Sequence, residues 1–116
     1  MQPLRSDLWC AAFVRRHNDQ GRFCVVARRG DPVAGQIWVE IEHLNGTTSL
    51  FTPAPSVRRP ENSADHIFEC RYDHVEPKVI AERIARETGF DPDLWVLALE
   101  LRDGGADHGL RLVPPN

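Results

Sequence analysis

Apolar residues near the start of the chain recur with the spacing of a helix. The stripe between residues 8 and 13 would share one helical face. Ser6 and Asp7 suit a helix start, because serine caps free amide groups and aspartate favours the positive end of the helix dipole. Gly21 can end the helix at about Gln20. The same apolar stretch could also form a strand, but the polar run that follows it favours the helix.

The next part of the chain changes to the two-residue period of strands. Ile37, Val39 and Ile41 would face one side of a sheet, while Trp38 lies on the other side with the glutamates. Asn45-Gly46 is a strong signal for a tight hairpin turn. The predicted strands of this part span residues 22–28, 36–44, 47–52 and 66–72, the last with His66, Phe68, Cys70 and Tyr72 on one face.

A second helical stripe and one further strand complete the pattern. Pro77 suits a first helical turn, Gly89 ends the helix, and the apolar stripe between them has helical spacing. Residues 93–101 form the last strand, which is apolar enough to be central in a sheet. The order α-β-β-β-β-α-β predicts an α+β fold, with a mostly antiparallel or mixed sheet covered by two helices.

The length of 116 residues supports one domain. We expect that domain to span residues 1–102, and the Gly- and Pro-rich residues 103–116 to form a flexible tail. Residues 53–65 contain three prolines and no apolar periodicity, so this long loop is expected to be functional or disordered.

Composition and charge narrow the class of protein. With 41% hydrophobic residues and a net charge of −3, the chain is neither globally disordered nor strongly basic. Its paired arginines have no interleaved aromatic residues to stack on bases, so a nucleic-acid partner is not expected.

The longest apolar stretch near the start, residues 8–14, is too short to span a membrane, which takes about 20 residues. Arg15 and Arg16 follow this stretch instead of preceding it, which argues against a signal peptide. The three cysteines form no Cys-x-x-Cys motif. We therefore expect a cytoplasmic protein with reduced thiols.

Spacing and composition predict no metal, cofactor or catalytic set. His66, Cys70 and His74 have metal-like spacing, but four residues along a strand separate side chains by about 13 Å. The cysteines lie within apolar runs, where thiols are usually inert. Asp and Glu residues are present, but nothing in the sequence pairs them for acid–base chemistry.

An arginine- and glycine-rich loop is the main candidate for ligand binding. Backbone amides and guanidinium groups could converge there on a phosphate or carboxylate. The alternative is a plain hairpin connection whose arginines pair with nearby acids. Arginines on the first helix could join the loop in one anion-binding face. The candidate residues are Arg15, Arg16, Arg28, Arg29, Gly30, Asp31 and Gly35.

Several short motifs, taken in their order along the chain, resemble a small bacterial family of unknown function, DUF1491. The motifs are Ser6-Asp7-Leu8-Trp9, Ala12, Arg15-Arg16, Gly21, Phe23, Arg29-Gly30-Asp31, Ala34-Gly35 and Asp91-Pro92-Asp93-Leu94-Trp95-Val96. The resemblance implies a single cytosolic domain in a bacterium and supplies no catalytic residues. Ala98 and Leu101 stand where acidic residues are usual in the family, which weakens any role for acids on the last strand.

The leading hypothesis is a non-enzymatic binding or interaction domain that recognises an anionic small molecule or an acidic protein. The alternative is a small enzyme acting on a phosphorylated or carboxylated metabolite, with Asp31 or His66 as acid or base. A pocket that unites either residue with Arg28 or Arg29 would favour the enzyme. A third hypothesis is a homodimer that uses an exposed face around Trp38.

Overall fold

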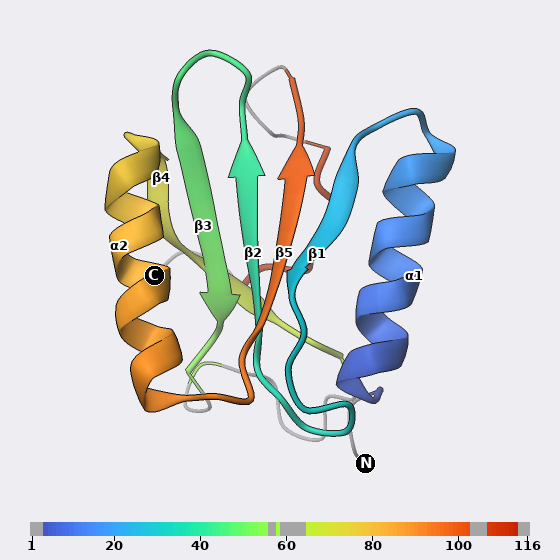
Figure 1. Cartoon of the computed structure of the whole chain (residues 1–116). Helices are drawn as coiled ribbons and strands as arrows, with labels where there is room; N and C mark the ends of the chain where they lie inside the picture. The colour runs from blue at the N-terminus through green and yellow to red at the C-terminus, as the bar shows by residue number, and fades with distance from the viewer. Residues whose placement is uncertain (1–3, 56–57, 59–64, 103–106, 114–116) are drawn as a thin grey trace.

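A five-stranded sheet lies between two helices in the computed structural model, which describes residues 4–55, 58, 65–102 and 107–113 (Figure 1). The elements follow the predicted order α-β-β-β-β-α-β, and the α+β class is confirmed. They are α1 (Ser6–Asp19), β1 (Cys24–Arg28), β2 (Ile37–Glu42), β3 (Thr48–Pro53), β4 (Phe68–Val75), α2 (Pro77–Phe90) and β5 (Trp95–Glu100).

The sheet is mixed and mostly antiparallel, with the strand order β1-β5-β2-β3-β4. Only β2 and β5 pair in parallel among these neighbours, and β5 is central, as its apolar sequence predicts. Ile37 pairs with Trp95 across the parallel ladder, so the odd-numbered residues of both strands share one face. This register aligns the apolar residues of both strands on each face of the sheet.

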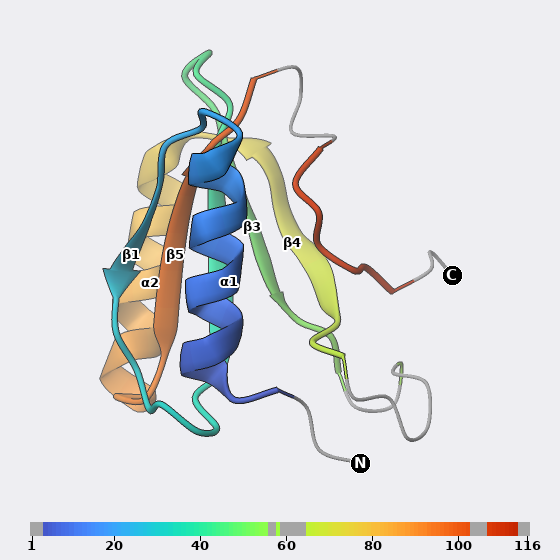
Figure 2. The same cartoon turned by 90° about the vertical axis from the view of Figure 1, so that its right-hand side faces the viewer.

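The two faces of the sheet carry separate hydrophobic clusters. On one face, Phe13 of α1 packs with Val39 and Leu97 of the central strands. On the other face, Ile80 of α2 packs with Trp38 and its neighbours. Figure 2 shows α1 in front of β5 and α2 behind it.

Trp38 is only 4% exposed, so the hypothesis of a dimer interface on an exposed Trp38 face is wrong. The Arg83 guanidinium of α2 lies 4.9 Å from the centre of the Trp38 ring. The indole N–H donates to Gln36 Oε1 at 2.8 Å. A tryptophan that is buried under a guanidinium and whose N–H has a partner is part of the core.

The prediction that Phe68, Cys70 and Tyr72 share one face of β4 is wrong. Cys70 pairs with Phe51, but Tyr72 pairs with Leu50, so β4 contains one extra residue between these pairs. Such a bulge changes which face the following residues occupy. Phe68 packs in the cluster with α1, whereas Tyr72 packs in the cluster with α2.

Two local predictions at element ends also need correction. The β2–β3 hairpin is confirmed, but its connection runs through residues 43–47 and is longer than a two-residue turn at Asn45-Gly46. Ser6 does not cap α1. Its buried hydroxyl donates to Gly35 O at 2.6 Å, while the Asp7 carboxylate accepts from the Leu8 amide at 2.8 Å.

Residues 107–113 lie beside β4, at the C-terminal end of the chain. The Phe68 amide donates to Arg111 O at 2.8 Å, and Leu110 is buried in the cluster with α1. Residues 103–106 and 114–116 lie outside the described part, and a flexible tail over 103–116 stays a prediction. Most of the loop 53–65 also lies outside it. No helix in the described ranges is long and apolar enough to cross a membrane.

Candidate functional site

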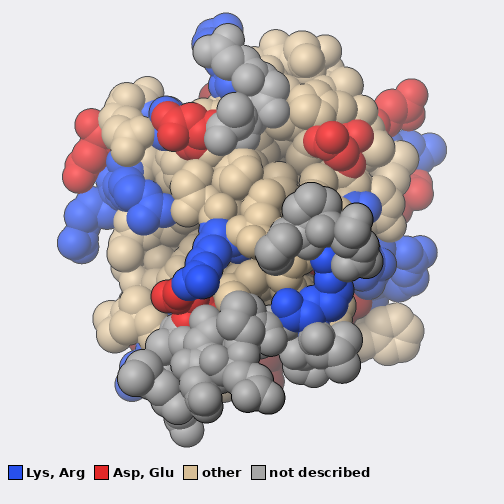
Figure 3. All heavy atoms as spheres, turned by 180° about the vertical axis from the view of Figure 1, so that it is seen from behind, with Lys and Arg blue, Asp and Glu red and all other residues tan. Residues whose placement is uncertain are grey.

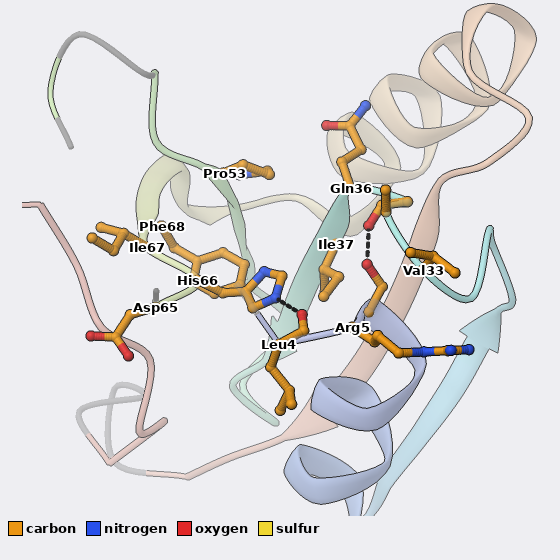
Figure 4. Close-up of a pocket in the computed structure, with 13 residues that line it drawn as sticks. Leu4, Arg5, Val33, Gln36, Ile37, Pro53, Asp65, His66, Ile67 and Phe68 are labelled. Carbon is orange, nitrogen blue, oxygen red and sulfur yellow. Dashed lines mark hydrogen bonds between the residues drawn. The ribbon is translucent and has the colours of Figure 1, made fainter. Parts of the chain in front are cut away.

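A cavity of about 280 Å³ opens where the start of α1, the loop before β2 and the start of β4 meet (Figure 4). The loop before β2 supplies Val33, Ala34 and Gly35 to its wall. Half of the other lining residues are apolar: Leu4, Ile37, Pro53, Ile67 and Phe68. A small, mainly apolar cavity with a few polar groups is the usual form of a small-molecule site.

His66 places an imidazole ring among these apolar side chains (Figure 4). Its Nε2 lies 2.7 Å from Leu4 O. A carbonyl oxygen can only accept, so Nε2 carries the proton and donates. The neutral ring then keeps a lone pair on Nδ1. The ring also contacts Trp9, with 5.6 Å between ring centres, and this contact helps to fix its orientation.

The other polar side chains of the lining have partners within the chain. Ser6 donates to Gly35 O. The Arg5 guanidinium pairs with Asp7 at 3.2 Å, and Figure 4 shows it directed away from His66. Asp65 forms an ion pair with Arg111. His66 is therefore the lining residue best placed to offer an uncommitted polar atom to a ligand.

Backbone amides of the arginine- and glycine-rich loop donate to a carboxylate of the same loop. Asp31 Oδ2 accepts from the backbone amides of Val33 at 3.1 Å and Ala34 at 2.9 Å. Gly30 and Gly35 pack so closely on Asp93 that a Cβ at either glycine would overlap its carbonyl oxygen. The glycines thus permit a close approach of two backbone segments.

Arg28 and Arg29 also have partners within the chain. Arg28 Nη2 donates to Pro92 O at 3.0 Å. The Arg29 guanidinium lies 5.2 Å from the centre of the Trp95 ring, in a cation–π contact. Neither arginine lines the cavity. The cavity therefore unites neither arginine with His66, so it does not meet the condition that would favour the alternative hypothesis of a small enzyme.

The structure does not bring Arg15 and Arg16 together with this loop. The loop meets the start of α1, where the Asp7 amide donates to Pro32 O. The hydrogen bond from Arg5, together with weaker charge effects that include Arg29, lowers the pKa of Asp7. Arg15 lies eight residues further along α1, which is about 12 Å at 1.5 Å per residue.

Figure 3 shows one face of the molecule on which the basic side chains are spread out. Acidic and uncharged groups lie between them there, instead of one continuous basic surface. Arg22 pairs with Asp107 at 2.5 Å, and Arg83 pairs with Glu87 at 3.0 Å. Among the described residues, these pairs further reduce the charge available for a polyanion.

Gly35 and His66 were both candidate residues from the sequence, but nothing in the sequence placed them in one cavity. Ser6, Gly35 and His66 are far apart in the sequence, and only the packing of α1 against the loop and β4 makes them neighbours. The irregular segment before β4 carried no apolar pattern that could reveal this contact.

The fold and the cavity define a small, single-domain α+β protein with a candidate small-molecule site. A family model described as "Protein of unknown function (DUF1491)" matches residues 4–107, and the chain belongs to this family. The resemblance found in the sequence motifs is thereby confirmed.

Solved structures with the same fold agree with this assignment. A protein from A. tumefaciens, known from a solution structure, is 33% identical with a TM-score of 0.81. The match covers 99% of this chain and 98% of that one. A crystal structure of a DUF1491 family protein from Caulobacter crescentus is 29% identical with a TM-score of 0.75, over 94% of this chain and 96% of that one. No curated protein matches the chain.

Proposed function

We propose that this protein is a binding domain, and that the cavity beside His66 takes a small carboxylic acid with an apolar body. The observation that carries the proposal is the uncommitted Nδ1 of His66 within a mainly apolar cavity. The anion recognition predicted for the loop is thus assigned to a neighbouring site, to which the loop contributes Val33, Ala34 and Gly35.

The chemistry of the lining favours this ligand class. Ile37 and Phe68 offer apolar surface to the body of the ligand. A histidine that binds a proton at Nδ1 can donate it to a carboxylate, and such charge-assisted hydrogen bonds are stronger than neutral ones. The bond from Nε2 to Leu4 O holds the ring while Nδ1 meets the ligand.

The cavity volume limits the size of the ligand. At about 280 Å³ it lies near the small end of ligand pockets. We therefore propose a metabolite-sized ligand, and not a nucleic acid or an extended acidic protein. The proposal also includes a cytoplasmic location, which the three free cysteines support.

The test is calorimetric titration of the protein with butanoate, hexanoate and benzoate, each compared with its primary amide. We expect the acids to bind more tightly than the amides, because a hydrogen bond to an ionised carboxylate is stronger than one to a neutral amide oxygen. In His66→Ala the preference for acids is expected to disappear and the affinity to fall about tenfold, equivalent to about 1.4 kcal/mol.

Two further variants separate this cavity from the arginines of the loop. Ala34→Phe adds bulk to a lining residue and is expected to weaken binding of every probe. Arg29→Ala lies outside the cavity and is expected to leave binding unchanged. Loss of binding in Arg29→Ala, with normal binding in His66→Ala, would return the site to the loop.

A further inference from the structure

His43 of the β2–β3 connection and His74 of β4 stack at the opposite end of β4 from the cavity. The rings of His43 and His74 have centres 3.8 Å apart and planes only 7° from parallel. Asp73 lies beside them, with its Oδ1 2.7 Å from His74 Nδ1. One possible metal-ligand atom from each of these residues lies within 4.8 Å of the others.

A second bulge in β4 explains why neighbouring residues reach the same place. Leu50 pairs with Tyr72, but Thr48 pairs with Val75, so β4 has an extra residue here too. His74 has a φ of 51°, the left-handed conformation that is uncommon outside glycine. In a regular strand Asp73 and His74 would point to opposite faces, and the bulge removes that constraint.

The hydrogen bonds around Ser49 determine which ring nitrogen of His43 carries the proton. Ser49 Oγ donates to Asp73 Oδ1 at 3.0 Å and accepts from the His74 amide at 3.0 Å. A hydroxyl has a single proton, so His43 Nε2, 2.8 Å away, must donate to Ser49. His43 Nδ1 therefore carries a lone pair, and it is buried without a hydrogen-bond partner in a residue that is 5% exposed.

His74 also has one ring nitrogen that donates a hydrogen bond and one that keeps a lone pair. Its Nδ1 donates to Asp73 Oδ1, because a carboxylate accepts, and Nε2 keeps a lone pair. Oδ1 of Asp73 already accepts two hydrogen bonds, which leaves Oδ2 for another partner. Histidines that bind metals commonly donate their second ring nitrogen to an oxygen acceptor, as His43 Nε2 donates to Ser49.

From this geometry we propose that His43, Asp73 and His74 form a binding site for one divalent transition-metal ion of the zinc type. Two imidazoles and one carboxylate are ligands that zinc accepts, and three protein ligands leave a position for water. Imidazole lone pairs lie in the ring plane, so one ring must tilt out of the stack when the ion binds. His74, whose side chain is 38% exposed, has the freedom to do so.

The proposal explains the buried, unpartnered nitrogen of His43. A buried polar atom without a hydrogen bond is costly, and such atoms are rare in folded proteins. A metal ion would give His43 Nδ1 a partner, while the hydrogen bond from Nε2 to Ser49 would still hold that ring. The site lies apart from the cavity at His66, so it does not depend on the function proposed for that cavity.

The test is a titration of the full chain, without an affinity tag, with Zn²⁺ in competition with a chromophoric chelator. We expect one ion per chain and at least tenfold weaker binding, about 1.4 kcal/mol, in His74→Asn and in Asp73→Asn. Asparagine tolerates the left-handed backbone at position 74, so the first variant removes a ligand with little strain. Melting temperatures confirm that both variants fold.

Two matched variants make the result specific. His66→Asn removes an imidazole at the other end of β4, and Cys70→Ser removes the exposed thiol of the same strand. Both are expected to bind Zn²⁺ like the unchanged protein, and Co²⁺ is expected to show no sulfur-to-metal charge-transfer band. Undiminished binding in His74→Asn, loss of binding in Cys70→Ser, or no binding by the unchanged chain would overturn the proposal.

Discussion

The carboxylate of Asp31 accepts a hydrogen bond from the backbone amide of Ala34 at 2.9 Å, so the loop binds an anion of its own chain. Its amides point inward to that carboxylate, as they would to an external phosphate or carboxylate. The loop is thereby held in the shape that forms one wall of the cavity.

Removal of this internal anion is expected to weaken the loop. In Asp31→Ala, two amides lose their acceptor, and the free energy of unfolding is expected to fall by about 1 kcal/mol. Urea denaturation measures the change. Asp93→Ala is the matched control, because that exposed carboxylate accepts neither of these bonds. Equal losses in both variants would show that the Asp31 bonds do not stabilise the loop.

Gly35 is expected to tolerate no larger side chain. A Cβ at this position would overlap Asp93 O, so Gly35→Ala must push two backbone segments apart. We expect a loss of about 1–3 kcal/mol in the free energy of unfolding, as for other overpacked sites. Gly89→Ala is the control. No atom lies within 4 Å of a Cβ there, and alanine should stabilise the helix by up to about 1 kcal/mol. Similar melting temperatures for the two variants would contradict the close approach.

Acid is expected to destabilise the protein through His17. Desolvation by burial is the main cause that lowers the pKa of His17 below its ordinary value of 6.5. The unfolded chain therefore takes up a proton more readily, so stability is complete above pH 6.5 and is lost as the pH falls from there toward the lowered folded pKa. Arg22 donates to His17 Nδ1 at 3.1 Å, and protonation at that nitrogen would break this bond.

Melting temperatures between about pH 7.5 and about pH 5.5 measure this effect. His17→Gln keeps an oxygen acceptor and an N–H donor but does not titrate. Its melting temperature should fall less over this range than that of the unchanged protein. Parallel curves for the two proteins would mean that His17 does not contribute to the pH dependence.

The three thiols are expected to differ in reactivity. Burial raises the pKa of Cys10 to about 12 and that of Cys24 to about 11, and both residues are buried. Cys70 is exposed and should react first with iodoacetamide, because a thiol must be accessible and ionised to react. Mass spectrometry of the native protein should find one modified cysteine, and three after unfolding. Early modification of Cys10 would contradict its burial in the core.

The sequence was sufficient to predict the elements and their order, because their apolar periodicity reflects burial on one face. The central position of β5 followed from its continuous apolar run. The bulges in β4 could not be predicted. Phe68 and Tyr72 are separated by an even number of residues, which is typical of side chains on one face, and nothing in the sequence shows that β4 has an extra residue between them. Ser6 resembled a helix cap, but a tertiary partner, Gly35 O, takes its hydroxyl instead.

The candidate site was less predictable than the fold. Arg28 and Gly30 were predicted to belong to a ligand-binding loop. The sequence could not show that Arg28 would donate to Pro92 O, or that Gly30 would pack against the backbone of Asp93. These contacts join segments more than sixty residues apart. Likewise, His43 joined Asp73 and His74 only because a hairpin and a bulge combine there, and no local motif signals that combination.

The proposed function requires the cavity beside His66 to bind a small apolar carboxylate. The most direct measurement is a ¹H–¹⁵N correlation spectrum of the protein during titration with hexanoate. We expect saturable shift changes centred on Ser6, Gly35, Ile37 and Phe68, which disappear in His66→Ala. Shift changes centred on Arg28 and Arg29 instead, or no saturable change at any amide, would contradict it.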